Sequence, residues 1–383
     1  MKIVWISHSQ KLGGAERSLL EATRGLVEKG HHVHVLLPSP GELVETLNAS
    51  GALTRVIPYA WWVHEGALPL SRGRQMHKLA SHLRAVLRIR AFLRRTHPDI
   101  VVTNTLTICA GAIAARSLGL PHCWYIHEFG EEDHGLFFDV GRARALRIIN
   151  YLSRAILVNS QSLFDHFAQF LPTDKLRLAR YAVDTSGLEA RVAATEAVRP
   201  EGPLKLILMG QIAPGKRQKD ALRALALLVE RKMDVHLTLV GSEHDAAYSA
   251  LLRQMVDELN LGSRVEFVAF SPHPLDYLAA ADVVLMCSRR EAFGRVTVEA
   301  MKLGKPVIGA NNAGTTELIQ DGVNGFLYPC GDAHALATKI EIFERERHLI
   351  GEMGYNAQEW ALQTFSLENY SETLLGIFGE STR

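Results

Sequence analysis

Two glutamates stand eight positions apart near the C-terminal end of the chain, Glu291 and Glu299, and their surroundings indicate a ligand-binding loop. The apolar run 282–286 predicts a buried strand and 295–303 predicts a helix, so Glu291 lies in the loop between them. The first turn of a helix offers unpaired N–H groups and a partial positive charge, which together bind anions. A phosphate at this turn would leave both carboxylates able to bind hydroxyl groups of the same ligand. The N–H groups that would face the phosphate belong to Gly294, Arg295 and Val296.

The simpler alternative for the two glutamates is that both are solvated surface acids. Glu299, however, is surrounded in the sequence by apolar Val298, Ala300 and Met301, where an unpaired charge would be costly. We therefore predict a binding role for both carboxylates, and we include Phe293 in the same predicted loop.

A second loop, Gly210 to Arg217, reads GQIAPGKR between a predicted strand and a predicted helix. Its first seven positions match the spacing of a P-loop, which makes a nucleotide triphosphatase a competing hypothesis. The eighth position of a P-loop must be Ser or Thr to bind magnesium, and Arg217 cannot do this. Pro214 also removes one N–H group from the predicted phosphate nest. The spacing alone is therefore not sufficient for a P-loop.

These loops and several further segments resemble the signature of the retaining glycosyltransferases of family 4, which have the GT-B fold. The resemblance extends over nearly the whole chain. The segments that carry it, besides the paired glutamates, are Met301 to Gly309, Asn312 to Glu317, Asp321 to Leu327, Gly13 to Arg17 and Lys29 to Val33.

The resemblance implies a role for each charged residue of the two loops. Lys216 would bind the diphosphate of a nucleotide sugar and neutralise charge on the leaving group, which a metal would otherwise have to do. Glu299 would bind the ribose hydroxyls and Glu291 the transferred sugar. The family often has Arg at the position of Gln211, so Arg217 or Arg295 would have to supply the missing cation.

Further residues of the predicted site come from other loops. Gly13 and Gly14 would let the backbone approach a phosphate, although a lone glycine pair is also typical of a plain turn. His127 follows a predicted strand, and the resemblance places it near the transferred sugar, with Glu128 beside it. The base of the nucleotide would be bound largely by backbone from Val268 to Phe270.

Short apolar runs alternate with helical patterns in both halves of the chain, which is typical of parallel sheets with helices on both faces. The predicted strands are 2–6, 33–37, 100–103, 122–126 and 155–159 in the first half, and 204–209, 236–240, 264–268, 282–286 and 306–309 in the second. At 383 residues the chain exceeds a typical domain of roughly 100 to 200 residues. The predicted fold is therefore α/β, with two Rossmann-like doubly wound domains.

The resemblance assigns the acceptor to the first domain, 1–184, and the nucleotide sugar to the second, 204–360. The segment 185–203 has no strand pattern and ends in Pro and Gly, so it is the predicted linker. Ligands of open α/β sheets bind beyond the carboxyl ends of the strands, which predicts an active site in a cleft between the domains. The stretch 360–378 predicts one amphipathic helix, and by resemblance the segment 361–383 crosses back to the first domain.

The segment 72–95 has the strongest charge asymmetry of the chain, because it contains eight basic residues and no acidic one. The basic residues are Arg72, Arg74, Lys78, Arg84, Arg88, Arg90, Arg94 and Arg95. Apolar residues keep helical spacing on another face, namely Leu79, Leu83, Val86, Leu87 and Leu93. One hypothesis is an amphipathic helix that packs this apolar stripe on the sheet. The other is attraction to an anionic membrane surface, with Trp61 and Trp62 as interfacial anchors or as part of the acceptor site.

The overall composition limits the partners and the location. Lys and Arg total 42 against 41 Asp and Glu, so no nucleic-acid partner is predicted. No His or Cys cluster has metal-ligand spacing, so we predict no metal and no cofactor besides the substrate, a UDP- or GDP-linked sugar. Four dispersed cysteines and the short apolar run at the N-terminus favour a cytoplasmic location, with association at the inner face of the membrane.

The hypothesis that combines these observations is a metal-independent, retaining hexosyltransferase with Lys216, Glu291 and His127 as catalytic residues. Its acceptor would be a hydroxyl of a glycan, a lipid-linked molecule or a small molecule, in cell-surface polysaccharide or glycolipid synthesis. Alternatives with the same fold are a nucleotide-sugar epimerase, a phosphorylase, and a non-catalytic scaffold, which Gln211 keeps open. A dinucleotide dehydrogenase is disfavoured because no G-x-G-x-x-G follows either opening strand.

Overall fold

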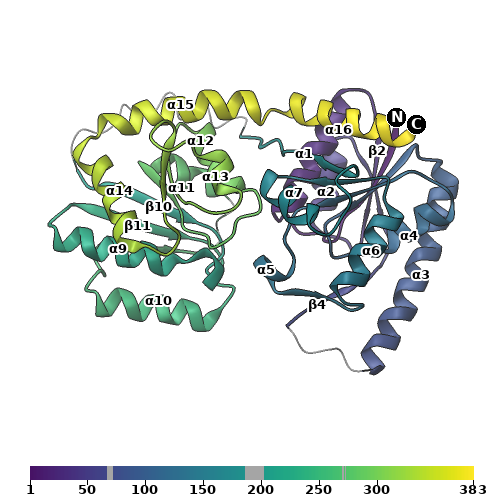
Figure 1. Ribbon diagram of the computed structural model, residues 1–383, viewed down its shortest axis with the longest axis horizontal. Helices are drawn as coiled ribbons and strands as arrows, with labels where there is room; N and C mark the ends of the chain where they lie inside the picture. The colour runs from purple at the N-terminus through teal and green to yellow at the C-terminus, as the bar shows by residue number, and fades with distance from the viewer. Residues whose placement is uncertain (67–71, 186–201, 270, 272) are drawn as a thin grey trace. The chain divides into compact units, whose positions relative to one another are not determined.

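The computed structural model describes residues 1–66, 72–185, 202–269, 271 and 273–383, except for the side chains at 72 and 74–77. The chain divides into two compact units, each built around its own parallel sheet (Figure 1). Unit 1 consists of Met1–Val183 and Phe365–Arg383, and unit 2 consists of Asp184–Thr364. Most of the predicted linker, at 186–201, lies outside the described residues.

Unit 1 has a seven-stranded sheet in the order β3-β2-β1-β5-β6-β8-β9, and all neighbouring strands in it are parallel. Its strands are β1 (Lys2–Ile6), β2 (His32–Leu37), β3 (Leu53–Val56), β5 (Ile100–Asn104), β6 (His122–Ile126), β8 (Ala155–Val158) and β9 (Leu176–Leu178). A separate antiparallel pair joins β4 (Val63–Glu65) to β7 (Leu136–Phe138). Because the chain winds outward from β1 in both directions, the sheet is doubly wound.

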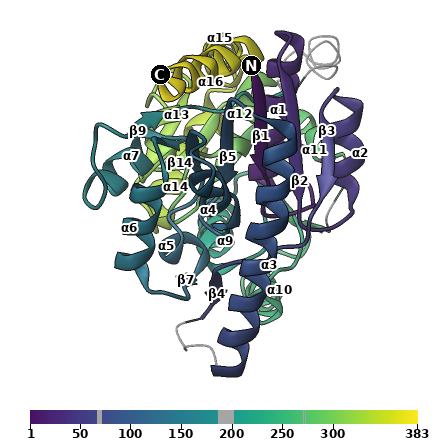
Figure 2. The same cartoon turned by 90° about the vertical axis from the view of Figure 1, so that its right-hand side faces the viewer.

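Helices cover both faces of this sheet, because successive side chains of a strand point to opposite faces. Val4 and Ile6 of β1 pack in one cluster with Ile89 of α3, which runs along the surface of unit 1 (Figure 2). Trp5 points to the other face and packs edge-on against Phe378 of α16, with ring centroids 6.2 Å apart. The helices of unit 1 are α1 (Gly14–Glu28), α2 (Glu42–Ala49), α3 (Arg72–Thr96), α4 (Ala110–Ser117), α5 (Glu131–His134), α6 (Arg142–Leu152), α7 (Gln161–Ala168) and α16 (Leu367–Thr382).

Unit 2 repeats the same architecture with a six-stranded parallel sheet in the order β12-β11-β10-β13-β14-β15. Its strands are β10 (Leu204–Met209), β11 (Val235–Val240), β12 (Val265–Val268), β13 (Val283–Met286), β14 (Val307–Ala310) and β15 (Gly325–Tyr328). Its helices are the 3₁₀ turn η1 (Pro214–Lys216), then α9 (Gln218–Glu230), α10 (Ala246–Glu258), α11 (Pro274–Ala280), α12 (Arg295–Lys302), α13 (Thr315–Leu318), α14 (Ala333–Arg345) and α15 (His348–Thr364).

The prediction of two doubly wound parallel-sheet units is confirmed, and each of the ten predicted strands occurs within one residue of its predicted ends. The single helix predicted at 360–378 is wrong. The helix is interrupted between α15, which ends at Thr364, and α16, which begins at Leu367. The hydroxyl of Ser366 accepts a hydrogen bond from the N–H of Asn369 at 3.2 Å and so caps the start of a new helix. The new helix, α16, packs against α1 within unit 1.

Candidate active site

The loop that carries Lys216 leaves the carboxyl end of β10 and crosses the loop that follows β11. A Cβ atom at Gly241 would overlap the backbone carbonyl of Gly210, so this crossing requires glycine. Beyond the crossing the loop forms η1. The N–H of Arg289 donates a hydrogen bond to the carbonyl of Gly215 at 2.8 Å, which holds the loop after β13 against η1.

The structure brings two predicted catalytic residues, Lys216 and Glu291, together from these two loops. The Lys216 Nζ atom lies 2.7 Å from Glu291 Oε2, and the two side chains are 32% and 17% exposed. The pair therefore lies at the carboxyl edge of the unit 2 sheet and remains in contact with solvent. This is the edge at which open α/β sheets bind ligands. A cation and a hydrogen-bond acceptor are thus side by side, as a ligand with phosphate and hydroxyl groups requires.

The helix α12 begins directly after Gly294, so the N–H groups of its first turn face the loop that contains Glu291. Glu299 is only 7% exposed, but it is not an isolated buried charge. Its Oε1 atom lies 3.0 Å from the Nε atom of Arg295, one turn earlier in the helix. The predicted site residues Gly294, Arg295, Val296 and Glu299 therefore lie together at the start of α12.

Arg217 and Arg295 were the two predicted substitutes for the arginine that Gln211 replaces, and both already have carboxylate partners. The guanidinium of Arg217 donates to the carboxylate of Asp220, which is fully buried. This hydrogen bond raises the pKa of Arg217 above its ordinary value. Gln211 itself is exposed, and its carbonyl accepts a hydrogen bond from Gln218 at 2.8 Å. Both arginines are thus already held by a carboxylate of unit 2.

The remaining predicted donor contacts lie around the same edge of unit 2. The Val268 carbonyl, at the end of β12, accepts a hydrogen bond from the N–H of Gly241 at 3.0 Å. The side chain of Phe293 is 4% exposed, so a donor contact at this position would come from the backbone. Phe270 lies outside the described residues.

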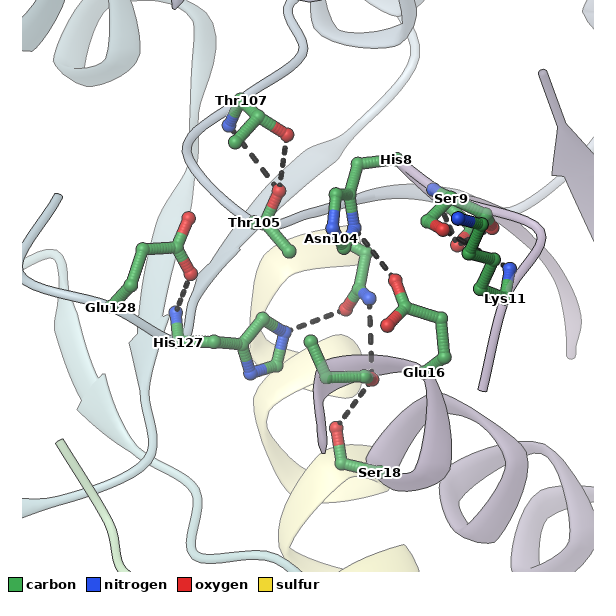
Figure 3. A network of polar contacts seen from close by, with 12 residues as sticks. His8, Ser9, Lys11, Glu16, Ser18, Asn104, Thr105, Thr107, His127 and Glu128 are labelled. Atoms are coloured by element: carbon green, nitrogen blue, oxygen red, sulfur yellow. Dashed lines mark hydrogen bonds and ion pairs between the residues drawn. The ribbon is translucent and has the colours of Figure 1, made fainter. Parts of the chain in front are cut away.

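In unit 1, His127 follows β6 and forms hydrogen bonds with Asn104, Tyr181 and Asn159, of which Figure 3 shows the one with Asn104. Its Nε2 atom lies 2.7 Å from the amide oxygen of Asn104, and its Nδ1 atom contacts the hydroxyl of Tyr181. An amide oxygen can only accept, so Nε2 carries the proton and Nδ1 accepts from Tyr181. Tyr181 in turn accepts from Asn159. Burial, with a smaller effect of His8, lowers the pKa of His127 well below its ordinary value, so its ring is neutral.

Two carboxylates lie near this histidine. Glu128 is 7% exposed and accepts hydrogen bonds from the N–H groups of Leu106 and His127. Burial raises the pKa of Glu128 to about 7, against the opposing effect of these donors and of His8. The Glu16 carboxylate lies 2.7 Å from His8 Nδ1. Burial opposes protonation of His8, but Glu16 and Glu128 together raise its pKa above the ordinary value.

The two predicted phosphate-loop glycines have different surroundings in unit 1. A Cβ atom at Gly13 would lie 2.8 Å from a carboxylate oxygen of Glu16, so the absence of a side chain at Gly13 makes room for Glu16. A Cβ atom at Gly14 would meet no described atom within 4 Å. Of the two glycines, only Gly14 therefore leaves open space in front of α1.

Sequence reasoning missed several polar residues of unit 1. Asn104 ends β5 and Asn159 follows β8, so the rule that selected His127, a polar residue at the end of an apolar strand, would also have found both. Glu16 lies within the segment Gly13 to Arg17 that carries the family resemblance, and His8 lies two residues after the end of β1. The predicted role of Trp62 as an interfacial anchor is wrong, because Trp62 is 5% exposed and stacks on Trp124 with centroids 5.8 Å apart.

No group of three or more His, Cys, Asp or Glu side chains among the described residues is arranged to hold a metal ion.

The two sets of predicted site residues, in unit 1 and in unit 2, each lie at the carboxyl edge of a parallel sheet. The shared cleft between the domains stays a prediction.

Two Rossmann-like units, each with polar residues at the carboxyl edge of its sheet, define the GT-B class of fold. Two family models match the chain, Glycosyltransferase Family 4 over residues 12–186 and Glycosyl transferases group 1 over residues 193–360. The chain belongs to the glycosyltransferases of the family 4 type. This membership sets aside the P-loop hypothesis.

Individual relatives are distant. The chain is 32% identical over 163 residues to the N-acetyl-alpha-D-glucosaminyl L-malate synthase of Bacillus anthracis, but this match covers 43% of the chain and only 42% of that protein. It is 26% identical to the 2-deoxystreptamine N-acetyl-D-glucosaminyltransferase of Streptomyces fradiae, over 95% of the chain and 93% of the relative. Among solved structures, Anabaena HepE in complex with UDP has a TM-score of 0.79 at 24% identity, and the alignment covers 99% and 100% of the two chains.

Proposed function

We propose that the protein is a metal-independent, retaining glycosyltransferase that moves a hexose-type sugar from a UDP- or GDP-linked donor to a hydroxyl group. The observation that carries the proposal is the contact between Lys216 and Glu291 at 2.7 Å beside the first turn of α12. Family membership and the full-length relative from Streptomyces fradiae, which is named as a glycosyltransferase, support it. HepE, which shares the fold, is described in complex with UDP and with UDP-glucose.

In the proposed reaction, the first turn of α12 binds the diphosphate and Lys216 neutralises the charge that develops on it. Glu299 binds the ribose hydroxyls and Glu291 binds the transferred sugar. The bond between the anomeric carbon and the phosphate oxygen breaks, and the acceptor oxygen bonds to the same face of that carbon. The acceptor proton passes to the leaving phosphate, so no protein side chain needs to be a covalent nucleophile. His127, which is neutral, would position the sugar by exchanging its hydrogen bond with Asn104 or Tyr181 for one with a sugar hydroxyl.

We propose that the acceptor is a hydroxyl group of a glycan, a lipid-linked molecule or a small molecule. The reaction would belong to the synthesis of cell-surface polysaccharide or glycolipid. The proposed location is the cytoplasm. All four cysteines, at 109, 123, 287 and 330, are free thiols, in keeping with a reducing compartment.

The first experiment is a thermal-shift screen of the purified protein against UDP, GDP, ADP and their sugars, with and without EDTA. A ligand that binds only the folded state raises the melting temperature, by an amount that grows with its concentration. Selective stabilisation by one nucleoside diphosphate and its sugar, unchanged by EDTA, would support the proposal. Stabilisation that disappears with EDTA would contradict the metal-independent site. Stabilisation without any turnover of the donor would favour the non-catalytic scaffold.

The stereochemistry needs a separate test, because nucleotide binding does not report it. Once a donor and an acceptor are found, proton NMR of the product gives its anomeric configuration. Retention of the donor configuration is expected, and inversion would contradict the proposed same-face attack.

A further inference from the structure

The helix α3 exposes a row of leucines on its outer side. Leu79, Leu83 and Leu87 are spaced by four residues, which places them on one face of the helix, and they are 63%, 62% and 57% exposed. One of the two hypotheses from the sequence placed the whole apolar stripe of this segment on the sheet, and it is wrong for these three leucines, whereas Leu93 of the same stripe is buried. Three other residues of α3, Ala85, Ile89 and Leu93, are buried in the core, and Ala85 and Ile89 lie on the side of the helix opposite Leu83 and Leu87. The helix therefore has a second apolar face that no described residue covers.

Arginines surround this leucine row. Arg90 and Arg94 lie seven residues after Leu83 and Leu87, so they continue the row by two turns. Arg84, Arg88 and Arg95 lie along one flank of it. None of these five arginines has a hydrogen bond or an ion pair with any residue that the structure describes. The five arginines and three leucines together are here called the α3 surface.

Lys78 belongs to the same basic segment but not to the α3 surface. Its ammonium donates hydrogen bonds to the carbonyl of Val63 and to the carboxylate of Asp139, at 3.0 and 2.8 Å. Lys78 therefore fixes the helix to the rest of unit 1. The five arginines of the α3 surface differ from Lys78, because none of them is bonded to another described residue.

We propose that the α3 surface docks on an anionic lipid bilayer. The three leucines extend over about 12 Å of the helix axis and would enter the boundary between head groups and acyl chains. The arginines would bind lipid phosphates at the same depth, since long basic side chains keep their charged ends in the head-group layer. Within the described residues, no helix is both long and apolar enough to cross a membrane. The helix would thus lie on the bilayer.

A second copy of the chain is the competing occupant of this face. Two α3 surfaces in contact would bring arginines against arginines, and α3 contains no acidic residue to pair with them. Like charges at an interface are unfavourable, whereas an anionic bilayer supplies the complementary charge along the whole row. The inference does not depend on the proposed reaction, although docking of this kind would suit a lipid-linked acceptor.

The test is co-sedimentation of the full chain with sucrose-loaded vesicles of phosphatidylcholine alone or with 30 mol% phosphatidylglycerol. We expect binding to the anionic vesicles that is at least tenfold stronger than to the neutral ones and that weakens as salt rises. The variant Leu79→Ala, Leu83→Ala, Leu87→Ala should lose at least tenfold in partition coefficient. The variant Arg84→Gln, Arg88→Gln, Arg94→Gln should lose at least as much, since each basic residue near the surface contributes about fivefold.

A matched control removes three exposed leucines from unit 2, Leu251, Leu259 and Leu362, which are 44%, 36% and 39% exposed. This control should bind the anionic vesicles as the natural chain does. Circular dichroism and the thermal shift with a nucleoside diphosphate should be unchanged in every variant, which separates a docking defect from a folding defect or a donor-site defect. Equal binding by the leucine variant and the natural chain would overturn the proposal. So would absence of vesicle binding together with a dimer, seen by ultracentrifugation, that the leucine variant abolishes.

Discussion

Replacing Lys216 with methionine would keep most of the aliphatic side chain and remove only the ammonium group. That group lies 2.7 Å from Glu291, and about a third of the lysine side chain, 32%, is exposed. Ion pairs at such accessible positions contribute about 0–1 kcal/mol to stability, because water competes with the contact. In a unit of this size such a loss lowers the melting temperature by about 4 °C at most. The variant should therefore fold normally.

The effect on turnover should be much larger. If Lys216 neutralises charge that appears on the diphosphate only as the glycosidic bond breaks, its removal costs about 2.7–4 kcal/mol of transition-state stabilisation, or 10²–10³ in kcat. The intact donor has less negative charge at the bridging oxygen, so its Kd should weaken by less than about tenfold. The two quantities are measured by release of the nucleoside diphosphate and by calorimetric titration with the donor.

The matched control is Lys219→Met, which removes an ammonium from the first turn of α9, three residues along the chain. It should leave both kcat and Kd within about twofold of the natural chain. The reasoning would be refuted if Lys216→Met kept its turnover and instead lost several degrees of melting temperature. The contact between Lys216 and Glu291 would then be a structural ion pair.

Three further outcomes follow from the structure. Gly241→Ala should lower the free energy of unfolding, measured by urea titration, by about 2 kcal/mol or more, because a Cβ atom there overlaps the backbone carbonyl of Gly210. The control Gly262→Ala, at a glycine with open space around it, should have little effect in the same titration. Tyr181→Phe leaves a buried nitrogen of His127 without its donor and should cost about 1–3 kcal/mol of stability by urea titration, together with a loss of turnover. Glu128 has its pKa raised to about 7 in the folded chain from 4.5. The folded state therefore binds more protons than the unfolded state between these values, and stability falls as pH rises from 4.5 to 7, by on the order of 3 kcal/mol. Glu128→Gln should flatten this decline, and an unchanged pH profile would contradict the raised pKa.

The strands that sequence reasoning missed are all short. β3, β4, β7, β9 and β15 are three or four residues long, and along β3 the side chains alternate between exposed and half-buried, so no apolar run marks it. Most of the strands that were predicted correctly are fully or mostly buried on both faces, as in β5 and β6, while the edge strand β12 is only half-buried. Burial on both faces leaves a continuous apolar run in the sequence, which makes such strands the easiest to predict.

The sequence by itself determined the features that depend on neighbouring residues. These include the alternation of strands and helices, the loop that contains Lys216, and the position of Glu291 and Glu299 on either side of the start of a helix. Such features are local, because the strand, the loop and the helix that follows are consecutive in the chain.

Only the tertiary structure decided which distant residues meet and which faces are covered. His127 bonds to Asn104 and Tyr181, which are 23 and 54 residues away, because a parallel sheet collects the ends of separate strands at one edge. The sequence pattern of α3 likewise contains more apolar positions than one sheet can cover. The packing of the helix turned Ile89 inward and left Leu83 in solvent, since a helix can present only one side to the core it packs against.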